Sequence, residues 1–177
     1  MGPASVPALM FITFVVLQRL GELVLARRNT AALLARGARE IGANHYPLMV
    51  GMHTTFLAAV AWFGWQAPVA LPWLAAYAVL QGLRGWILAS LGSRWTTRII
   101  ILDEPLVVRG PYRFFSHPNY VLVVAELIVV PMVLGLVWVA LIFTVLNAAM
   151  LALRISVEQQ GLDQIAVGRI DDISRLG

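Results

Sequence analysis

The chain has 177 residues, of which 60% are hydrophobic and 12% charged, and its formal net charge is +4. Because an ordinary soluble domain has about 25% charged residues and so short a chain cannot bury this much apolar surface, the composition excludes a soluble globule, a disordered chain and a coiled coil. All 13 basic residues are arginines between hydrophobic runs, a distribution typical of a polytopic membrane protein and not of a nucleic-acid-binding surface, and the absence of cysteine excludes disulfides and thiolate chemistry.

Five segments are apolar and long enough to be membrane spans, for which about 20 residues suffice. The polar stretch after the first span carries Arg27, Arg28, Arg36 and Arg39 and predicts a short amphipathic helix at the membrane interface. A tight, uncharged turn with two prolines separates the second span from the third. The expected spans are residues 7–26, 46–65, 73–91, 119–133 and 136–153.

The last two spans come from one apolar run between Tyr120 and Leu153. As a single helix this run would be on the order of 50 Å long, which exceeds an apolar bilayer core of about 30 Å. Pro131 and Gly135 near its middle therefore predict two short helices folded as a hairpin, each slightly shorter than the bilayer. The tail, residues 154–177, is expected to be a polar helical extension.

Among the loops, arginine occurs in one set only, which predicts the orientation. Segments 27–45, 92–117 and 154–177 hold 4, 4 and 3 arginines, whereas the short turns between the other spans hold none. The positive-inside rule places these three segments in the cytoplasm and the N-terminus outside. We therefore expect residues 1–177 to form one all-α, multi-pass domain of the cell (inner) membrane, with the segments 92–118 and 154–177 lining a cytoplasmic pocket.

Four ionisable residues stand inside the expected spans, where charge is costly: Arg19, Glu22, Arg84 and Glu126. One interpretation is a packing network in which the two positive and two negative groups neutralise each other between helices. The alternative is that Glu126 or Arg84 faces a substrate cavity. His53 is expected to be a hydrogen-bonded core residue, and the three histidines lack the spacing of a metal site.

The segment 104–120 is the most informative part of the chain. Pro118 suits the first turn of a helix, which places His117 at the N-cap and free N–H groups at the interface. Arg109 and Arg113 add positive charge nearby. These residues predict either a pocket for a small anionic or zwitterionic ligand, or a basic loop that anchors to lipid headgroups.

Two motifs then carry a resemblance to a known family. Gly-Pro-Tyr-Arg-Phe-Phe-Ser-His-Pro-Asn-Tyr (110–120) and Arg-Ile-Ser-Val-Glu (154–158) resemble the two-part signature of the isoprenylcysteine carboxyl methyltransferase family, integral membrane enzymes that use S-adenosylmethionine. The N-terminal half is similar to a bacterial branch whose members methylate alkylpyrones or alkylresorcinols. That similarity lies in residues 18–22, 26–29, 45–47 and 93–98.

The resemblance implies which residues form the site. The arginine of the second motif, Arg154, is implied to be catalytic, Thr97 to be a possible further cofactor contact, and no metal is implied. The implied cofactor-binding residues are Glu104, Pro105, Leu106, Val107, Tyr112, His117, Pro118, Asn119, Tyr120 and Glu158.

The expected function is therefore a membrane S-adenosylmethionine-dependent O-methyltransferase whose partners are membrane lipids and a lipophilic or prenylated acceptor. The acceptor group is either an alkylpyrone or alkylresorcinol hydroxyl or an isoprenylcysteine carboxylate. A carboxylate is already an anion, whereas a phenol must lose its proton, and Arg154 can stabilise either anion. Two alternatives stay open, a membrane NADPH-dependent reductase of related architecture and a non-enzymatic membrane scaffold.

Overall fold

The computed structural model of the chain describes the backbone of residues 4–102, 104–105 and 107–176, and the side chains among these as far as residue 160. In this part of the chain five α-helices account for most of the regular structure, which confirms the expected all-α membrane fold. The helices are α1 (Val6–Ala35), α2 (Tyr46–Gly64), α3 (Leu71–Leu91), α4 (Pro118–Val133) and α5 (Val137–Leu176). The short elements are the 3-10 turns η1 (Ala43–His45), η2 (Gly92–Arg94) and η3 (Gly110–Arg113) and the strands β1 (Arg39–Ile41) and β2 (Ile99–Ile101).

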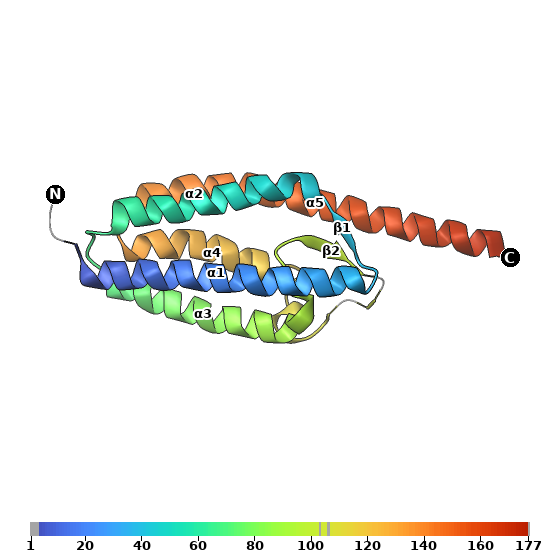
Figure 1. Cartoon of the computed structure of the whole chain (residues 1–177), viewed down its shortest axis with the longest axis horizontal. Coiled ribbons are helices and arrows are strands. Elements are labelled where there is room, and N and C mark those ends of the chain that lie inside the picture. Colours follow the sequence, from blue (N-terminus) through green and yellow to red (C-terminus); the bar gives the residue numbers. More distant parts are fainter. Residues whose placement is uncertain (1–3, 103, 106, 177) are drawn as a thin grey trace.

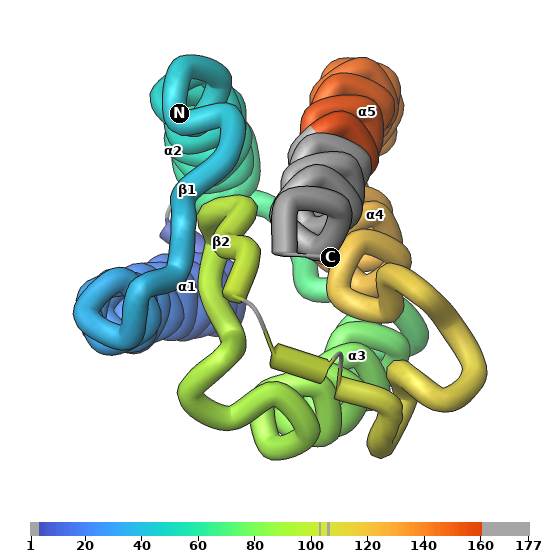
Figure 2. The backbone as a smooth tube through the Cα atoms, turned by 90° about the vertical axis from the view of Figure 1, so that its right-hand side faces the viewer, coloured from blue at the N-terminus to red at the C-terminus, as the bar shows by residue number. Residues whose placement is uncertain are grey.

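The five helices lie along the long axis of the molecule, and α5 extends beyond the others (Figure 1). Viewed down that axis, α1, α2, α5, α4 and α3 follow one another around the bundle, with the two strands across the near end (Figure 2). We call this end, formed by residues 36–45 and 92–117, the arginine-rich end. The opposite end holds the turns at 65–70 and 134–136.

Proline and glycine set the helix ends. A proline stands in the first turn of α1, α2, α3 and α4, where its missing N–H costs no hydrogen bond. The chain reverses between α4 and α5 at Gly135, whose φ of 68° favours glycine, while the N–H of Leu136 donates to the carbonyl oxygen of Pro131 (2.9 Å). The expected hairpin therefore turns at the glycine, and Pro131 lies inside α4.

The helices differ in their reach across a bilayer. Four are long and apolar enough to cross one, namely α1, α2, α3 and the part of α5 that ends at Gln160. α4 has only 16 residues. At about 1.5 Å per residue it measures about 24 Å, less than the roughly 30 Å of an apolar bilayer core.

Two local features differ from the sequence expectations. The separate amphipathic helix expected over residues 27–39 does not form, because residues 22–36 contain no glycine or proline that would end α1. β1 and β2 pair as a small antiparallel sheet that the periodicity did not predict, because three residues are too few to show a pattern. The helical extension expected after residue 153 is present, as the continuation of α5.

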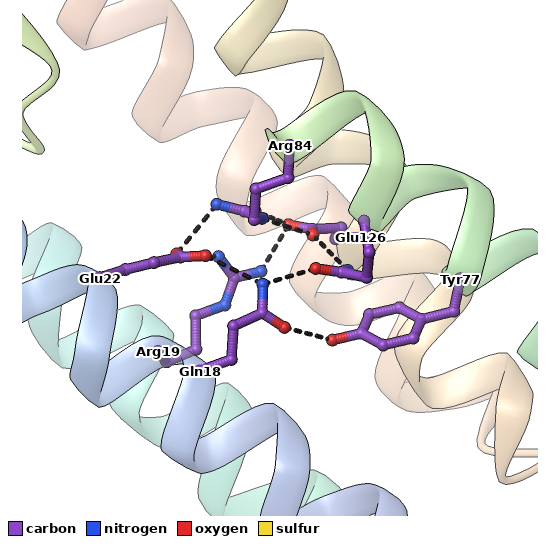
Figure 3. A network of polar contacts seen from close by, with 7 residues as sticks. Gln18, Arg19, Glu22, Tyr77, Arg84 and Glu126 are labelled. Atoms are coloured by element: carbon purple, nitrogen blue, oxygen red, sulfur yellow. Dashed lines mark hydrogen bonds and ion pairs between the residues drawn. The ribbon is translucent and has the colours of Figure 1, made fainter. Parts of the chain in front are cut away.

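The four ionisable residues of the spans meet between α1, α3 and α4 (Figure 3). Arg19 donates to Glu126 at 2.5 Å and to Glu22 at 2.9 Å. Arg84 donates to Glu22 at 2.9 Å and forms a two-pronged contact with Glu126. Two positive and two negative charges thus neutralise each other, the arrangement that the packing interpretation expects.

Neutral polar side chains complete this network. Gln18 on α1 donates to Gln81 on α3 (2.6 Å), and Gln81 donates in turn to Glu126 (3.2 Å). The hydroxyl of Tyr77 donates to Gln18 (2.7 Å), and its ring packs edge-on against Phe11, with ring centroids 5.2 Å apart. Long polar side chains therefore connect α1 to α3 and α4 by hydrogen bonds in the middle of otherwise apolar helices.

Glu126→Gln should reduce the free energy of unfolding by about 3–5 kcal/mol, because two buried arginines then share one remaining carboxylate. Unfolding of the purified protein by sodium dodecyl sulfate in mixed micelles measures this. Glu40→Gln is the matched control, since the half-exposed pair of Glu40 and Arg98 should contribute less than about 1 kcal/mol. Equal losses in the two variants would show that the buried network does not stabilise the bundle.

Candidate functional site

The first motif forms a turn at the arginine-rich end, just ahead of α4. Gly110 has a φ of 60°, and a Cβ there would lie 2.0 Å from Ser90 Oγ, so glycine lets η3 approach the last turn of α3 closely. Arg109 secures this contact by donating from Nε to the carbonyl oxygen of Ser90 (2.9 Å). As expected, α4 begins at Pro118 with His117 at the N-cap, and the His117 side chain makes no capping hydrogen bond.

The two motifs meet where α4 begins and α5 leaves the bundle. The hydroxyl of Tyr120 donates to Glu158 Oε2 at 3.0 Å. The imidazole of His117 stacks on the Tyr120 ring, with centroids 5.1 Å apart and planes 7° from parallel. The guanidinium carbon of Arg154 lies 5.8 Å from the centroid of the same ring. Four of the residues singled out in the sequence therefore form one cluster.

Arg154 is the most unusual member of this cluster, because its side chain is buried and no carboxylate among the side chains described up to residue 160 pairs with it. The residue is 6% exposed. Its Nη2 donates to the carbonyl oxygen of Thr97 (3.1 Å) and its Nη1 to the thioether of Met49 (2.9 Å), which is a weak acceptor. Among the described side chains none forms an ion pair with Arg154, so its positive charge is available to an anion.

The carbonyl group that orients Arg154 is itself held by α1 and α2. Asn29 on α1 donates to the carbonyl oxygen of Trp95 (2.7 Å), which fixes the chain two residues ahead of Thr97. Tyr46 in the first turn of α2 shares a hydrogen bond with the Thr97 hydroxyl (3.1 Å). Thr97, expected as a possible cofactor contact, thus contacts Arg154 through its backbone.

The segment ahead of the first motif lies beside an open cavity of about 500 Å³. Glu104 in this segment forms ion pairs with Arg36 at the end of α1 and with Arg94 in η2, and Arg94 also donates to the carbonyl oxygen of Pro105 (2.6 Å). The cavity is lined by Leu91, Gly92, Ser93, Arg94, Pro105, Val107, Val108 and Arg109.

The structure therefore places the expected site residues in two groups at one end of the bundle. Pro105 and Val107 line the cavity, and Glu104 pairs with arginines beside it. Leu106 lies outside the described residues. Pro118 is buried and Asn119 follows it in the first turn of α4.

Two contacts of Arg154 and Thr97 were not found from the sequence. Met49 carries no signal, because a methionine on an apolar helix is ordinarily a packing residue. Tyr46 belongs to the 45–47 segment that carries the similarity to the bacterial branch. That similarity and its position next to Pro47 at a helix start are the signals in the sequence that could have indicated a role for Tyr46 at the site.

Tyr112, in η3, packs beside the Tyr120 cluster and is half-buried. Burial raises the pKa of Tyr112 to about 12, and the nearby Tyr120 and Glu158 raise it further in the same direction. Tyr112 is therefore a neutral phenol at physiological pH, able to donate or accept a hydrogen bond and to offer an aromatic face.

Comparison with known proteins assigns a family to this site. The profile of the isoprenylcysteine carboxyl methyltransferase (ICMT) family matches residues 73–164, which include both motifs and the cavity. The chain is 33% identical over 169 residues to the uncharacterized protein YpbQ of Bacillus subtilis (strain 168), covering 89% of this chain and 98% of that protein. No solved structure matches the chain.

Tyr112→Phe should make the protein less sensitive to alkali. Because the folded pKa of about 12 exceeds the unfolded value, folding favours the neutral phenol. This stabilisation is present below a pH of about 10 and is lost as the pH rises through the folded pKa. Thermal unfolding between these pH values measures the effect, and an alkaline slope that is the same in wild type and variant would contradict it.

Proposed function

Because the chain belongs to the isoprenylcysteine carboxyl methyltransferase family, we propose that it transfers a methyl group from S-adenosylmethionine to an oxygen atom of a lipophilic acceptor. Family membership indicates a membrane methyltransferase, and the four long apolar helices agree with a membrane-embedded protein. The methyl donor, the oxygen acceptor and the orientation are our proposal. The arginine-rich end faces the cytoplasm, since the positive-inside rule applies to its loops.

The residues at this end suit the chemistry of the donor, which carries a sulfonium, an ammonium, a carboxylate and an adenine ring. The α4 N-terminus, without a side-chain cap, suits the carboxylate. The carboxylates of Glu104 and Glu158 suit the ammonium or the ribose hydroxyls, and the rings of Tyr112 and Tyr120 suit the adenine or the sulfonium. A cavity of about 500 Å³ is within the range of small-molecule sites.

The observation that carries the proposal is the buried Arg154, which forms no ion pair with any described carboxylate. A buried cation is costly unless an anion neutralises it, so a site that keeps one is suited to a negatively charged ligand group. Among the described residues its hydrogen-bonding neighbours are the neutral groups of Thr97, Met49 and Tyr120, none of which carries a negative charge to match its own. An acceptor carboxylate or phenolate supplies the negative charge that is missing.

In this mechanism the chain acts mainly through position and charge. When bound, the donor supplies a methyl group attached to a positively charged sulfur, ready for displacement in line with the attacking oxygen. Arg154 holds the acceptor oxygen as an anion and aligns it, while Thr97 keeps the guanidinium in its orientation. Glu158, fixed by Tyr120, holds the polar end of the donor one helical turn away on the same face of α5.

Incubation of the purified protein with radiolabelled S-adenosylmethionine and a panel of lipid acceptors tests this function. Transfer of label to an alkylresorcinol, an alkylpyrone or an S-farnesylcysteine is the expected result. Calorimetry with S-adenosylmethionine and with NADPH separates the methyltransferase from the reductase, and a scaffold binds neither. Absence of binding heat from millimolar S-adenosylmethionine would contradict the proposal.

Arg154→Ala should reduce kcat by about 100-fold or more, because the acceptor anion loses its main stabilising charge. Donor affinity, measured by calorimetry, should stay within a few fold of wild type, since Glu158 and the α4 N-terminus are intact. Arg28→Ala is the matched control: this exposed arginine of α1 lies outside both groups of site residues. Wild-type turnover in Arg154→Ala would remove Arg154 from the mechanism.

A further inference from the structure

His45, the last residue of η1, stands beside the Arg154 cluster but has no role in the function proposed above. It precedes Met49 by four positions, so the two side chains lie one turn apart on the same face of the helix start. Met49 contacts Arg154, and the side chain one turn further along α5 is Val157. α2 and α5 run in opposite directions (Figure 1), so residues that precede Met49 face residues that follow Arg154.

The packing around Gly42 confirms this placement. A Cβ on Gly42 would lie 2.2 Å from His45 Cε1 and 2.7 Å from Val157 Cγ1, so imidazole and valine lie against the same point. Arg154 is near enough to act electrostatically on the imidazole. The ring nitrogens of His45 make no hydrogen bond to any residue that the structure describes, and the side chain is only partly buried.

The other histidines are committed to different contacts. His53, two turns further along α2, bonds through Nδ1 to the backbone oxygen of Met49 at 2.9 Å. His117 stacks on the ring of Tyr120. Among the described histidines, His45 is thus the one whose side chain makes neither a hydrogen bond nor a ring stack, and its imidazole lies beside Val157 of α5, one turn from Arg154.

We propose that His45 is the general base of the reaction when the acceptor is a hydroxyl compound. The inference rests on the proposed function and assigns a further residue to it. The hydroxyl proton passes to an imidazole nitrogen, the acceptor oxygen bonds to the methyl carbon, and the methyl–sulfur bond breaks with its electron pair remaining on sulfur. Histidine suits this task because its ordinary pKa lies near neutrality, whereas that of a phenol is about 10.

The pairing of a neutral base with an unpaired cation is what favours a hydroxyl over a carboxylate. A carboxylate reaches the site already ionised, so it needs Arg154 but no base. A phenol needs both, because its proton must leave and the resulting phenolate must be stabilised. Burial and the nearby positive charge of Arg154 both lower the pKa of His45, so the imidazole gives up its proton more readily than a free histidine does.

His45→Gln is the primary test, with a 5-alkylresorcinol as acceptor and the full chain in detergent micelles. We expect kcat to fall about 100-fold or more, in line with general-base catalysis, and the acidic limb of the pH profile of kcat/KM to disappear. Asn44→Gln is the matched control, since it changes the exposed neighbour of His45 in η1 and removes no imidazole. Added imidazole should restore turnover in His45→Ala, which a merely structural role would not permit.

A second measurement does not depend on turnover. In protein labelled at histidine Cε1, the His45 resonance is assigned by its absence from His45→Gln, and its titration midpoint should coincide with the acidic limb of the wild-type profile. Wild-type turnover in His45→Gln, failure of imidazole rescue or a displaced midpoint would overturn the proposal for His45. Failure of the proposed function looks different, because wild type itself would then bind no S-adenosylmethionine.

Discussion

The structure depends on the cost of leaving an ionised group unpaired in an apolar surrounding. Arg19, Glu22, Arg84 and Glu126 meet this constraint by pairing with one another between three helices. The pairing fixes α1 against α3 and α4 at a depth where few other polar partners exist. Arg154 breaks the pattern, since it is buried and has no described counterion. The contrast separates charges that hold the fold together from the charge that we propose binds a ligand.

The fixed position of α1 matters because its far end reaches the site. α1 contributes Arg19 to the charge network and, roughly three turns later, Asn29 to the loop that carries Thr97. The carbonyl of Thr97 then orients Arg154. A helix outside the segment matched by the family profile, residues 73–164, is thus connected through two hydrogen bonds to the residue on which the proposed chemistry rests.

Local rules account for what could be predicted from the sequence. Prolines at 47, 72 and 118 start helices and Gly135 reverses the chain, because backbone constraints act over a few residues. Arg154 and Glu158 share a face because they stand four apart on a helix. The pairing of Arg19 with Glu126, the contact of Met49 with Arg154 and the β1–β2 sheet join residues far apart in the chain, so they depend on helix packing that no local pattern encodes.

The shortness of α4 has a consequence for how an oily molecule reaches the site. With 16 residues, α4 is shorter than the roughly 30 Å of an apolar bilayer core, so a site at its first turn would lie nearer the acyl chains than one at the end of a longer helix. Withdrawing a long alkyl chain into water would cost about 0.8 kcal/mol for every methylene group. The lipophilic acceptor that we propose would present its reactive oxygen to such a site while its tail remains among the acyl chains, and it would arrive by lateral diffusion without extraction into water.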